Sequence, residues 1–385
     1  MMKILYFSNS RIPTEKGYGI QIMKMCQSFG AIMDSVVLVT PTKKNKAFIG
    51  VDAFDYYRVK RNFFFQKLWC LDPSWIAEKM RQGIYIKIQA TFWLVSLFFY
   101  LIFKKNKSSC ICYTRDEYSL PLLQLFFRRV VWEAHTLPRN TKRYFQYWQR
   151  CSRLVVITQG LKDELTALGL ANDNILVAPD AVDLSEFEEI KSTKRELRQK
   201  LGLPVDKNII MYTGHLYDWK GTQCLADAAQ FLADQDHIVF VGGSDEKFDL
   251  GSFRSQNKTN QRVLILGYRP YDQIPAYLKS ADVLVLPNSA HHQKSKTWTS
   301  PLKLFMYMAS GTPIVAANLP SLNEILNPEN AIFYQPDDPA DMANVIKKLL
   351  TNQSLAIKIS AKAYSDVQNH TWSKRAQKII DFINS

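Results

Sequence analysis

Residues 297–326 read TWTSPLKLFMYMASGTPIVAANLPSLNEIL and combine a helix start, a helix end and a strand start in one run. Ser300 is a common N-cap residue and Pro301 suits the first turn, so the pattern predicts a helix that begins here. Gly311 is the kind of residue that ends a helix, and the apolar strand PIVAA follows at once. A helix that leads directly into a buried strand is typical of α/β folds.

The start of this helix also predicts an anion-binding site. Thr299, Ser300 and Leu302 bring backbone N–H groups to the helix N-terminus, and Lys303 adds a positive charge. Such a terminus attracts phosphate, because its N–H groups have no acceptor inside the helix and the helix dipole is positive there. The alternative is an ordinary capped helix with a structural role only.

The same alternation of strands and helices extends in both directions, and at 385 residues the chain exceeds what one core usually supports. We predict two doubly wound, Rossmann-like domains of class α/β, residues 1–187 and 188–370, with a final helix in residues 371–385 that returns to the first domain. The predicted strands are 3–9, 36–40, 109–113, 130–133 and 153–158 in the first half, and 209–214, 238–243, 263–267, 283–287 and 313–317 in the second.

The net charge of +14 is concentrated in the first part of the chain. Residues 1–153 contain 25 Lys and Arg against 9 Asp and Glu, so they carry +16 and the remainder carries −2. This asymmetry predicts an anionic partner: nucleic acid, a phosphorylated substrate or an anionic membrane surface. Nucleic acid is the least favoured, since no finger, homeodomain-like or RNP-type motif is present.

The segment 84–103 is nearly apolar, with no charge after Lys87, and Lys104, Lys105 and Lys107 follow it. A helix that spans a membrane would separate strands of one sheet, so we do not expect one. Two interpretations remain open. The helix is buried against the sheet, or its outer face meets lipid while its lysines contact phosphates.

The six cysteines, at positions 26, 70, 110, 112, 151 and 224, lack the paired spacing of a zinc site. We interpret them as small buried side chains in a reducing cytoplasm. The start Met-Met-Lys runs directly into a strand, so we expect no signal peptide. No Asp-x-Asp motif stands where it would hold a catalytic metal ion.

Ligands of doubly wound sheets bind beyond the carboxyl ends of the strands, so the residues that follow strands are candidate site residues. Gly17 and Gly19 allow close backbone approach, or serve only a tight turn. His135 follows a strand and would hydrogen-bond a sugar hydroxyl or a phosphate, although a lone histidine is often structural. In the second half, Gly214 ends a strand, and Lys220 would face a bound diphosphate or remain solvated.

Eight segments carry a resemblance along nearly the whole chain: IPTEKGYGIQIMKMC, YTRDEYSLPLL, WEAH, VVITQGLKDEL, ILVAPDAVDLSEF, TGHLYDWKG, LGYRPYDQIPAYLKSADVLVLPNS and SPLKLFMYMASGTPIVA. They resemble the retaining family-four glycosyltransferases of GT-B architecture, in the subgroup with an SPLK motif. The resemblance implies two domains that face a cleft, a nucleotide diphosphate sugar as donor, no cofactor, and transfer with retention and without a metal ion.

The resemblance also implies roles for particular residues. The catalytic candidates are Lys220, which would stabilise the leaving diphosphate, and His135, which would contact the sugar or the acceptor. The donor-binding candidates are Gly17, Gly19, Gly214, His215, Tyr268, Ile274, Thr299, Ser300, Pro301, Leu302, Lys303 and Met306.

Three positions depart from the family pattern. His215 replaces an arginine that follows the first glycine of the second domain, and two glutamates fall on Trp298 and Met306. A thioether is a weak acceptor, and a lost hydrogen bond to ribose costs roughly 1 to 3 kcal/mol, so we expect weakened or altered donor binding at Met306.

We therefore expect a cytoplasmic, metal-independent hexosyltransferase at the inner face of the membrane, with a glycan or lipid-linked acceptor from polysaccharide biosynthesis. Two alternatives remain. An epimerase-like enzyme of the same architecture would turn over the nucleotide sugar without an acceptor. A catalytically weakened binding or scaffold relative would account for the substitutions at Trp298, Met306 and His215.

Overall fold

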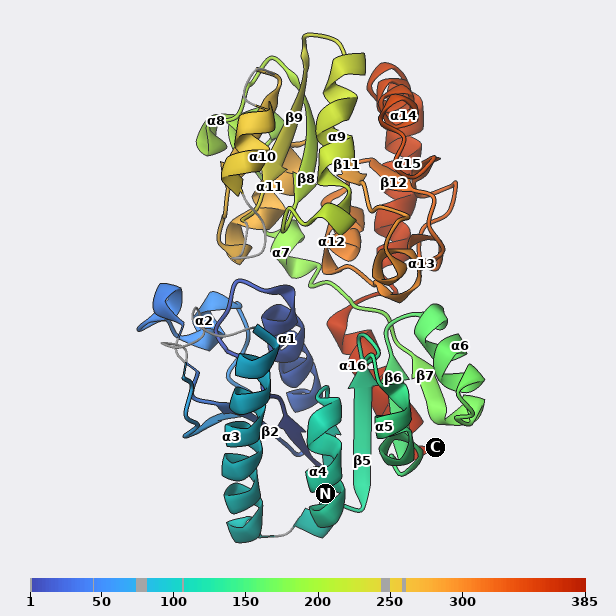
Figure 1. The fold of residues 1–385 in the computed structure, drawn as a ribbon. Coiled ribbons are helices and arrows are strands. Elements are labelled where there is room, and N and C mark those ends of the chain that lie inside the picture. The colour runs from blue at the N-terminus through green and yellow to red at the C-terminus, as the bar shows by residue number, and fades with distance from the viewer. Residues whose placement is uncertain (1, 44, 74–81, 106, 244–249, 258–260) are drawn as a thin grey trace. The chain divides into compact units, whose positions relative to one another are not determined.

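The computed structural model describes residues 2–43, 45–73, 82–105, 107–243, 250–257 and 261–385. It divides the chain into two units, each built on one parallel sheet (Figure 1). The first unit comprises Met1–Ile157, Leu161–Ala178 and Trp372–Ser385, and the second comprises Thr158–Gly160 and Pro179–Thr371. The predicted class, two doubly wound parallel α/β sheets, is confirmed.

The first unit has a seven-stranded sheet in the order β3-β2-β1-β4-β5-β6-β7, in which every neighbouring pair is parallel. Its central strands are buried on both faces, which explains their continuous apolar sequences. The strands are β1 (Lys3–Phe7), β2 (Ser35–Pro41), β3 (Phe64–Leu68), β4 (Cys110–Thr114), β5 (Arg129–Ala134), β6 (Arg153–Val156) and β7 (Ile175–Val177).

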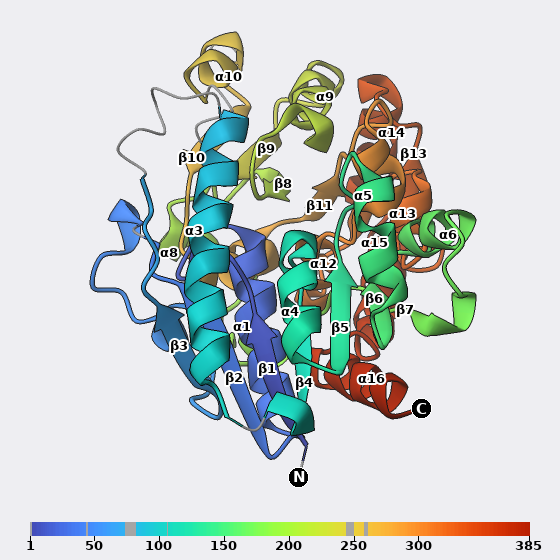
Figure 2. The same cartoon turned by 60° about the horizontal axis from the view of Figure 1, so that its bottom comes forward.

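Helices cover both faces of this sheet (Figures 1 and 2). Helices α3, α4 and α5 lie on one face, as right-handed crossovers require, while α1 packs against α16 on the other. The helices are α1 (Gly17–Gly30), α2 (Ala53–Tyr56), α3 (Gln82–Phe103), α4 (Leu120–Phe126), α5 (Thr141–Gln149), α6 (Gln159–Ala167) and α16 (Trp372–Asn384).

The second unit has a six-stranded parallel sheet in the order β10-β9-β8-β11-β12-β13. Its strands are β8 (Asn208–Thr213), β9 (Asp236–Val241), β10 (Val263–Gly267), β11 (Val283–Leu286), β12 (Ile314–Ala317) and β13 (Ile332–Tyr334). Its helices are α7 (Ser185–Glu188), α8 (Lys194–Leu201), α9 (Thr222–Ala228), α10 (Leu250–Asn257), α11 (Ile274–Ser280), α12 (Leu302–Ser310), α13 (Pro320–Asn323), α14 (Pro339–Thr351) and α15 (Gln353–Val367).

The division between the units falls after Ala178, earlier than the predicted boundary at residue 187. Hydrogen bonds explain the difference, because they hold the intervening residues on the second unit. The Asp180 N–H donates to Ser300 Oγ at 3.0 Å, and Tyr271 Oη donates to Glu186 Oε2 at 2.8 Å. Helix α16, in contrast, belongs to the first unit.

Candidate functional site

In the second unit, a glycine follows each of the neighbouring strands β8 and β9, and the two backbones approach closely there. Gly214 has φ of +121°, and a Cβ atom there would lie 2.9 Å from Lys303 Nζ. A Cβ atom on Gly242 would lie 1.9 Å from the carbonyl oxygen of Gly214. Only glycine fits at either position, so the sequence keeps this part of the sheet edge open to Lys303.

The Lys303 ammonium group is buried at this edge, in the first turn of α12. Its Nζ lies 3.6 Å from the centre of the Tyr212 ring and has no hydrogen-bond partner among the described residues. Tyr307, one turn further along α12, accepts a hydrogen bond from the Thr213 N–H at 2.8 Å. This bond fixes α12 to the end of β8, and the ring contact orients the lysine.

Lys220 lies in a single 3-10 turn, Asp218–Lys220, after β8. Its Nζ is 3.8 Å from the centre of the Trp219 ring. Gly221 follows with φ of +67°, and a Cβ atom there would lie 1.8 Å from the Pro287 carbonyl oxygen. The glycine therefore lets the loop that carries Lys220 pack directly against the end of β11.

The two lysines form a pair that has no counter-charge among the described residues. Burial, and then repulsion from Lys220, lower the pKa of Lys303 well below its usual range. Burial, and then Lys294, lower the pKa of Lys220 to about 7. No carboxylate in the described part of the chain raises either pKa. An anion placed between these groups would restore their charge, so the site is suited to phosphate.

The start of α12 differs in one detail from the prediction. Pro301, not Ser300, occupies the N-cap position, and no side chain caps the helix. The Ser300 hydroxyl instead accepts from the Asp180 N–H, so the predicted capping role is wrong. Leu302 and Lys303 begin the helix, and their N–H groups lack intrahelical acceptors by position. Thr299 is buried just before them.

Four further donor-binding candidates lie on neighbouring elements of the second unit. The His215 ring stacks on Tyr217, with ring centres 5.2 Å apart and planes 3° apart. Tyr268 follows β10 and is 44% exposed, and Ile274 is the first residue of α11. Met306 is buried in α12, so its thioether stands in the first turns of the same helix as Lys303.

In the first unit, His135 follows β5 and joins a buried network around Glu133. The Glu133 carboxylate accepts hydrogen bonds from His135 Nε2 at 2.6 Å, Gln21 Nε2 at 2.7 Å and Arg375 at 2.8 Å, and also from Tyr113. Arg375 comes from α16, so the last helix of the chain completes the network. Arg115 lies nearby, since its charge lowers the pKa of His135.

The charges in this network determine the protonation state of His135. Burial alone would raise the pKa of Glu133, but Arg375, His135 and Arg115 hold it well below the usual range. Burial and Arg115 lower the pKa of His135 to about 4, against the opposing effect of Glu133. His135 is therefore neutral at pH 7. Because an ionised carboxylate only accepts, Nε2 carries the proton and Nδ1 keeps a lone pair that can accept a hydrogen bond.

Gly19 has a packing role that the sequence does not reveal. A Cβ atom there would lie 2.2 Å from Tyr57 Oη, and that hydroxyl bridges the backbone N–H and carbonyl of Thr14. Gly17 is the first residue of α1. Neither glycine has a positive φ, so close contact rather than a special turn explains Gly19.

Sequence reasoning missed Glu133, Arg375 and Arg115 as parts of the His135 site. Glu133 was visible within WEAH, two residues before His135, and a strand places residues i and i+2 on one face. Arg375 gave no comparable signal, because it lies 240 residues from His135 along the chain.

No cluster of three or more His, Cys, Asp or Glu side chains suited to a metal ion occurs within the described residues. The sequence does contain Asp234-Gln235-Asp236, but Asp236 begins β9, at the opposite end of the strand from Gly242. Independence from metal stays a prediction. Five of the six cysteines are buried.

Comparison with known proteins defines the fold first. The chain has the GT-B fold, with two parallel-sheet α/β domains. The structure of Alr3699/HepE from Anabaena, in complex with UDP and glucose, covers 100% of both chains with a TM-score of 0.76 and 16% identity.

The second unit carries the more particular match. Residues 207–352, which include Lys220 and Lys303, match the family described as Glycosyl transferases group 1. A Bacillus subtilis protein named as the teichuronic acid biosynthesis glycosyltransferase TuaC is 25% identical, over 61% of this chain and 57% of its own length. The D-inositol 3-phosphate glycosyltransferase of Xylanimonas cellulosilytica is 27% identical, over 59% and 55% respectively. The chain thus spans little more than half the length of these relatives.

Proposed function

We propose that this protein is a glycosyltransferase that moves a sugar from a nucleotide diphosphate sugar to an acceptor. The observation that carries the proposal is the pair Lys220 and Lys303 at the carboxyl ends of a parallel sheet. The Lys303 nitrogen is buried, Lys220 is half-buried, and no carboxylate among the described residues raises the pKa of either. They lie within the segment that matches the group 1 glycosyl transferases. The solved relative of the same fold binds UDP and glucose, which supports this donor class.

The proposed chemistry is electrostatic. As the bond between the sugar and the diphosphate breaks, negative charge develops on the leaving oxygen. Lys220, Lys303 and the first N–H groups of α12 are donors that stabilise such charge without reorganising. We propose retention at the anomeric carbon and no requirement for metal, as in the resembling family. The neutral His135, held by Glu133, accepts a hydrogen bond from a hydroxyl of the sugar or acceptor.

We propose a lipid-linked or surface-polysaccharide acceptor, used in the cytoplasm at the inner face of the membrane. The basic first part of the chain supports this, since residues 1–153 carry +16. The name of the Bacillus relative, which refers to teichuronic acid biosynthesis, points in the same direction.

Met306 favours a second candidate, a relative that binds donor weakly or serves as a scaffold. Its buried thioether offers no charged acceptor to a ribose hydroxyl. Under the transferase proposal, Met306→Glu should strengthen donor binding measured by calorimetry. Unchanged affinity would remove the idea that this position weakens the donor site.

The decisive experiment combines binding and turnover. A thermal-shift screen with UDP, GDP and ADP should identify one base that stabilises the protein, because a ligand that binds only the folded state raises the melting temperature. The matching sugar nucleotides are then incubated with and without membrane lipid extract. Transfer to lipid supports the proposal, conversion without acceptor indicates an epimerase, and binding without either indicates a scaffold.

A further inference from the structure

Helix α3 presents an apolar face to solvent. Its 22 residues contain one charge, Lys87, and only 22% of its most apolar 18-residue window is buried. Along its second half the exposed side chains are Val95, Phe98, Phe99, Ile102 and Phe103, of which Phe99 is 56% and Phe103 79% exposed. Soluble proteins rarely expose contiguous aromatic surface, so this face requires a partner.

The opposite face of α3 is fixed to the sheet. Gln89, Trp93, Leu97 and Leu101, spaced four residues apart, are all buried. Gln89 exchanges two hydrogen bonds of 2.9 Å with Asn9 at the end of β1. A helix held in this way cannot cross a bilayer without leaving its domain, although its length and composition would suffice. It can only lie on a surface.

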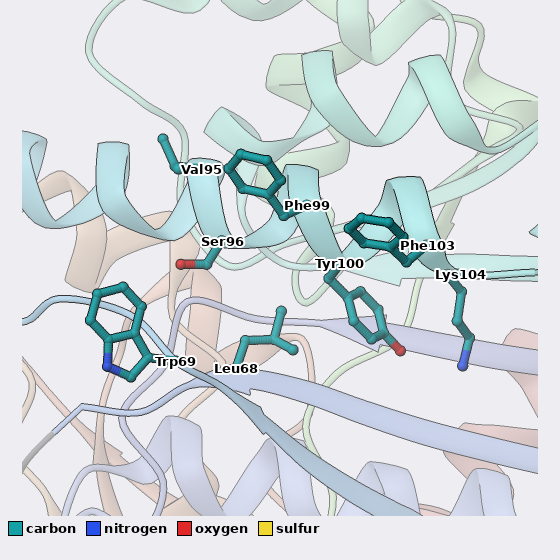
Figure 3. Close-up of a pocket in the computed structure, with 8 residues that line it drawn as sticks. All are labelled: Leu68, Trp69, Val95, Ser96, Phe99, Tyr100, Phe103 and Lys104. Atoms are coloured by element: carbon teal, nitrogen blue, oxygen red, sulfur yellow. The ribbon is translucent and has the colours of Figure 1, made fainter.

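A surface hollow of about 550 Å³ adjoins the apolar face of α3 (Figure 3). One wall consists of α3, and the other consists of Leu68 at the end of β3 together with Trp69. Trp69 is 77% exposed, and large amphipathic rings of this kind concentrate at the boundary between lipid and water.

Cations border this face at the C-terminal end of the helix. Lys104 Nζ lies 5.6 Å from the Tyr100 ring centre, and Lys104 also lines the hollow. Lys105 follows and is exposed. On the other wall, Lys67 precedes Leu68, with Nζ 5.3 Å from the Phe65 ring centre. The cations therefore lie on both sides of exposed aromatic rings, the arrangement of interfacial membrane anchors.

We propose that the α3 face, defined as Trp69, Val95, Phe98, Phe99, Ile102 and Phe103, inserts into the headgroup layer of an anionic bilayer. Lys67, Lys104 and Lys105 contact lipid phosphates while the helix lies in the plane of the membrane. The charge distribution selects lipid as the occupant, because an apolar face bordered by lysines complements an anionic surface better than it complements a second copy of itself. The inference rests on the membrane location proposed above, but not on the transfer reaction.

The test measures co-sedimentation of the purified full chain with two kinds of vesicle, phosphatidylcholine alone and phosphatidylcholine mixed with phosphatidylglycerol. Binding should prefer the anionic vesicles and weaken with salt. Phe99→Ser/Phe103→Ser should lower the partition coefficient at least about tenfold on both vesicles, since two large apolar side chains no longer insert. Lys104→Glu/Lys105→Glu should lower it about tenfold or more on anionic vesicles only.

Matched controls lie on the second unit. Ile357→Ser changes an apolar side chain that is 59% exposed on α15, and Lys347→Glu/Lys348→Glu changes two exposed lysines on α14. Neither should alter vesicle binding. The variants change exposed side chains, apart from Lys104, which is half-buried, and unchanged circular dichroism confirms that each variant folds.

Several outcomes overturn the inference. The chain does not sediment with anionic vesicles, or the Phe variant binds them as the original chain does. Dimers in solution that the Phe variant abolishes, without vesicle binding, assign the face to a second copy. Resistance to alkaline carbonate extraction assigns α3 to a spanning segment. Sugar transfer is measured separately in detergent, so its failure and the failure of membrane binding are distinguishable.

Discussion

The two units differ in whether a buried ionisable group at the end of a strand has hydrogen-bond partners. At the end of β5, the Glu133 carboxylate accepts from Arg375 at 2.8 Å, His135 at 2.6 Å and Gln21 at 2.7 Å. At the end of β8, the buried Lys303 ammonium contacts the Tyr212 ring and has no hydrogen-bond partner among the described residues. The first charge is compensated by the protein, and the second is not.

The difference indicates what each cluster is for. A compensated network contributes to a single arrangement of its members, so Glu133 and Arg375 are positioning residues for His135. An uncompensated cation lowers the stability of the free protein and gains its counter-charge from a ligand. The comparison therefore predicts opposite effects of mutation. Removal of a charge from the first cluster should destabilise the fold, whereas removal of one from the second should weaken binding.

The largest expected effect is that of Glu133→Gln on stability. The substitution leaves Arg375 charged and buried without its carboxylate, which typically costs about 3 to 5 kcal/mol. Urea denaturation, followed by a signal from the first unit, should show a loss of this size in the free energy of unfolding. Thermal unfolding should shift in the same direction.

The controls separate a buried pair from an exposed one. Asp206→Asn removes an exposed ion pair with Arg195, 3.7 Å long, and should cost less than about 1 kcal/mol. Glu133→Gln/Arg375→Met removes both buried charges and should recover part of the loss. If Glu133→Gln costs no more than Asp206→Asn, the network does not stabilise the first unit and the comparison fails.

The central strands and the lysine pair were predictable because local patterns determine them. The apolar runs of the strands that became β1, β4, β8 and β11 have one stable placement, in the middle of a parallel sheet. Lys220 and Lys303 each follow such a strand or begin the next helix, where phosphate sites form. Chain order alone places both lysines at the carboxyl ends of the strands of one sheet.

Other features were not predictable, because the sequence signal was weak or distant. Three outermost strands of the two sheets were missed: β3 is largely exposed, and β7 and β13 have three residues each. The predicted N-cap at Ser300 was wrong because its hydroxyl accepts a hydrogen bond from the Asp180 N–H, which is distant in the sequence. For α3 one face is buried, as the first interpretation predicts, while contact of the exposed face with lipid stays a prediction.

An intermediate effect is expected for Lys303→Met in the second unit. Affinity for the nucleoside diphosphate identified by the screen should fall about ten- to a hundredfold in calorimetry, since a hydrogen bond to a charged group contributes roughly 1.5–3 kcal/mol. Stability without ligand should stay constant or rise, because the variant no longer buries an uncompensated ammonium group. Lys347→Met, an exposed lysine on α14, is the matched control and should change neither quantity. A large loss of stability in Lys303→Met would show that the lysine serves the fold.

The smallest expected effect is a pH dependence of binding that comes from Lys220. Its pKa of about 7 in the free protein means that it is mostly neutral at pH 8 and mostly charged at pH 6. A bound diphosphate favours the charged form and raises this pKa, so binding above pH 7 takes up a proton and becomes weaker as pH rises. The affinity should fall about three- to fivefold between pH 7 and 8. Calorimetry in two buffers of different ionisation enthalpy reports the uptake directly, and comparison with Lys220→Met at the same pH cancels the titration of the nucleotide itself. Equal proton uptake by both proteins at pH 8 would mean that Lys220 is already charged before the ligand arrives, and the contrast between the two units would then rest on Lys303 alone.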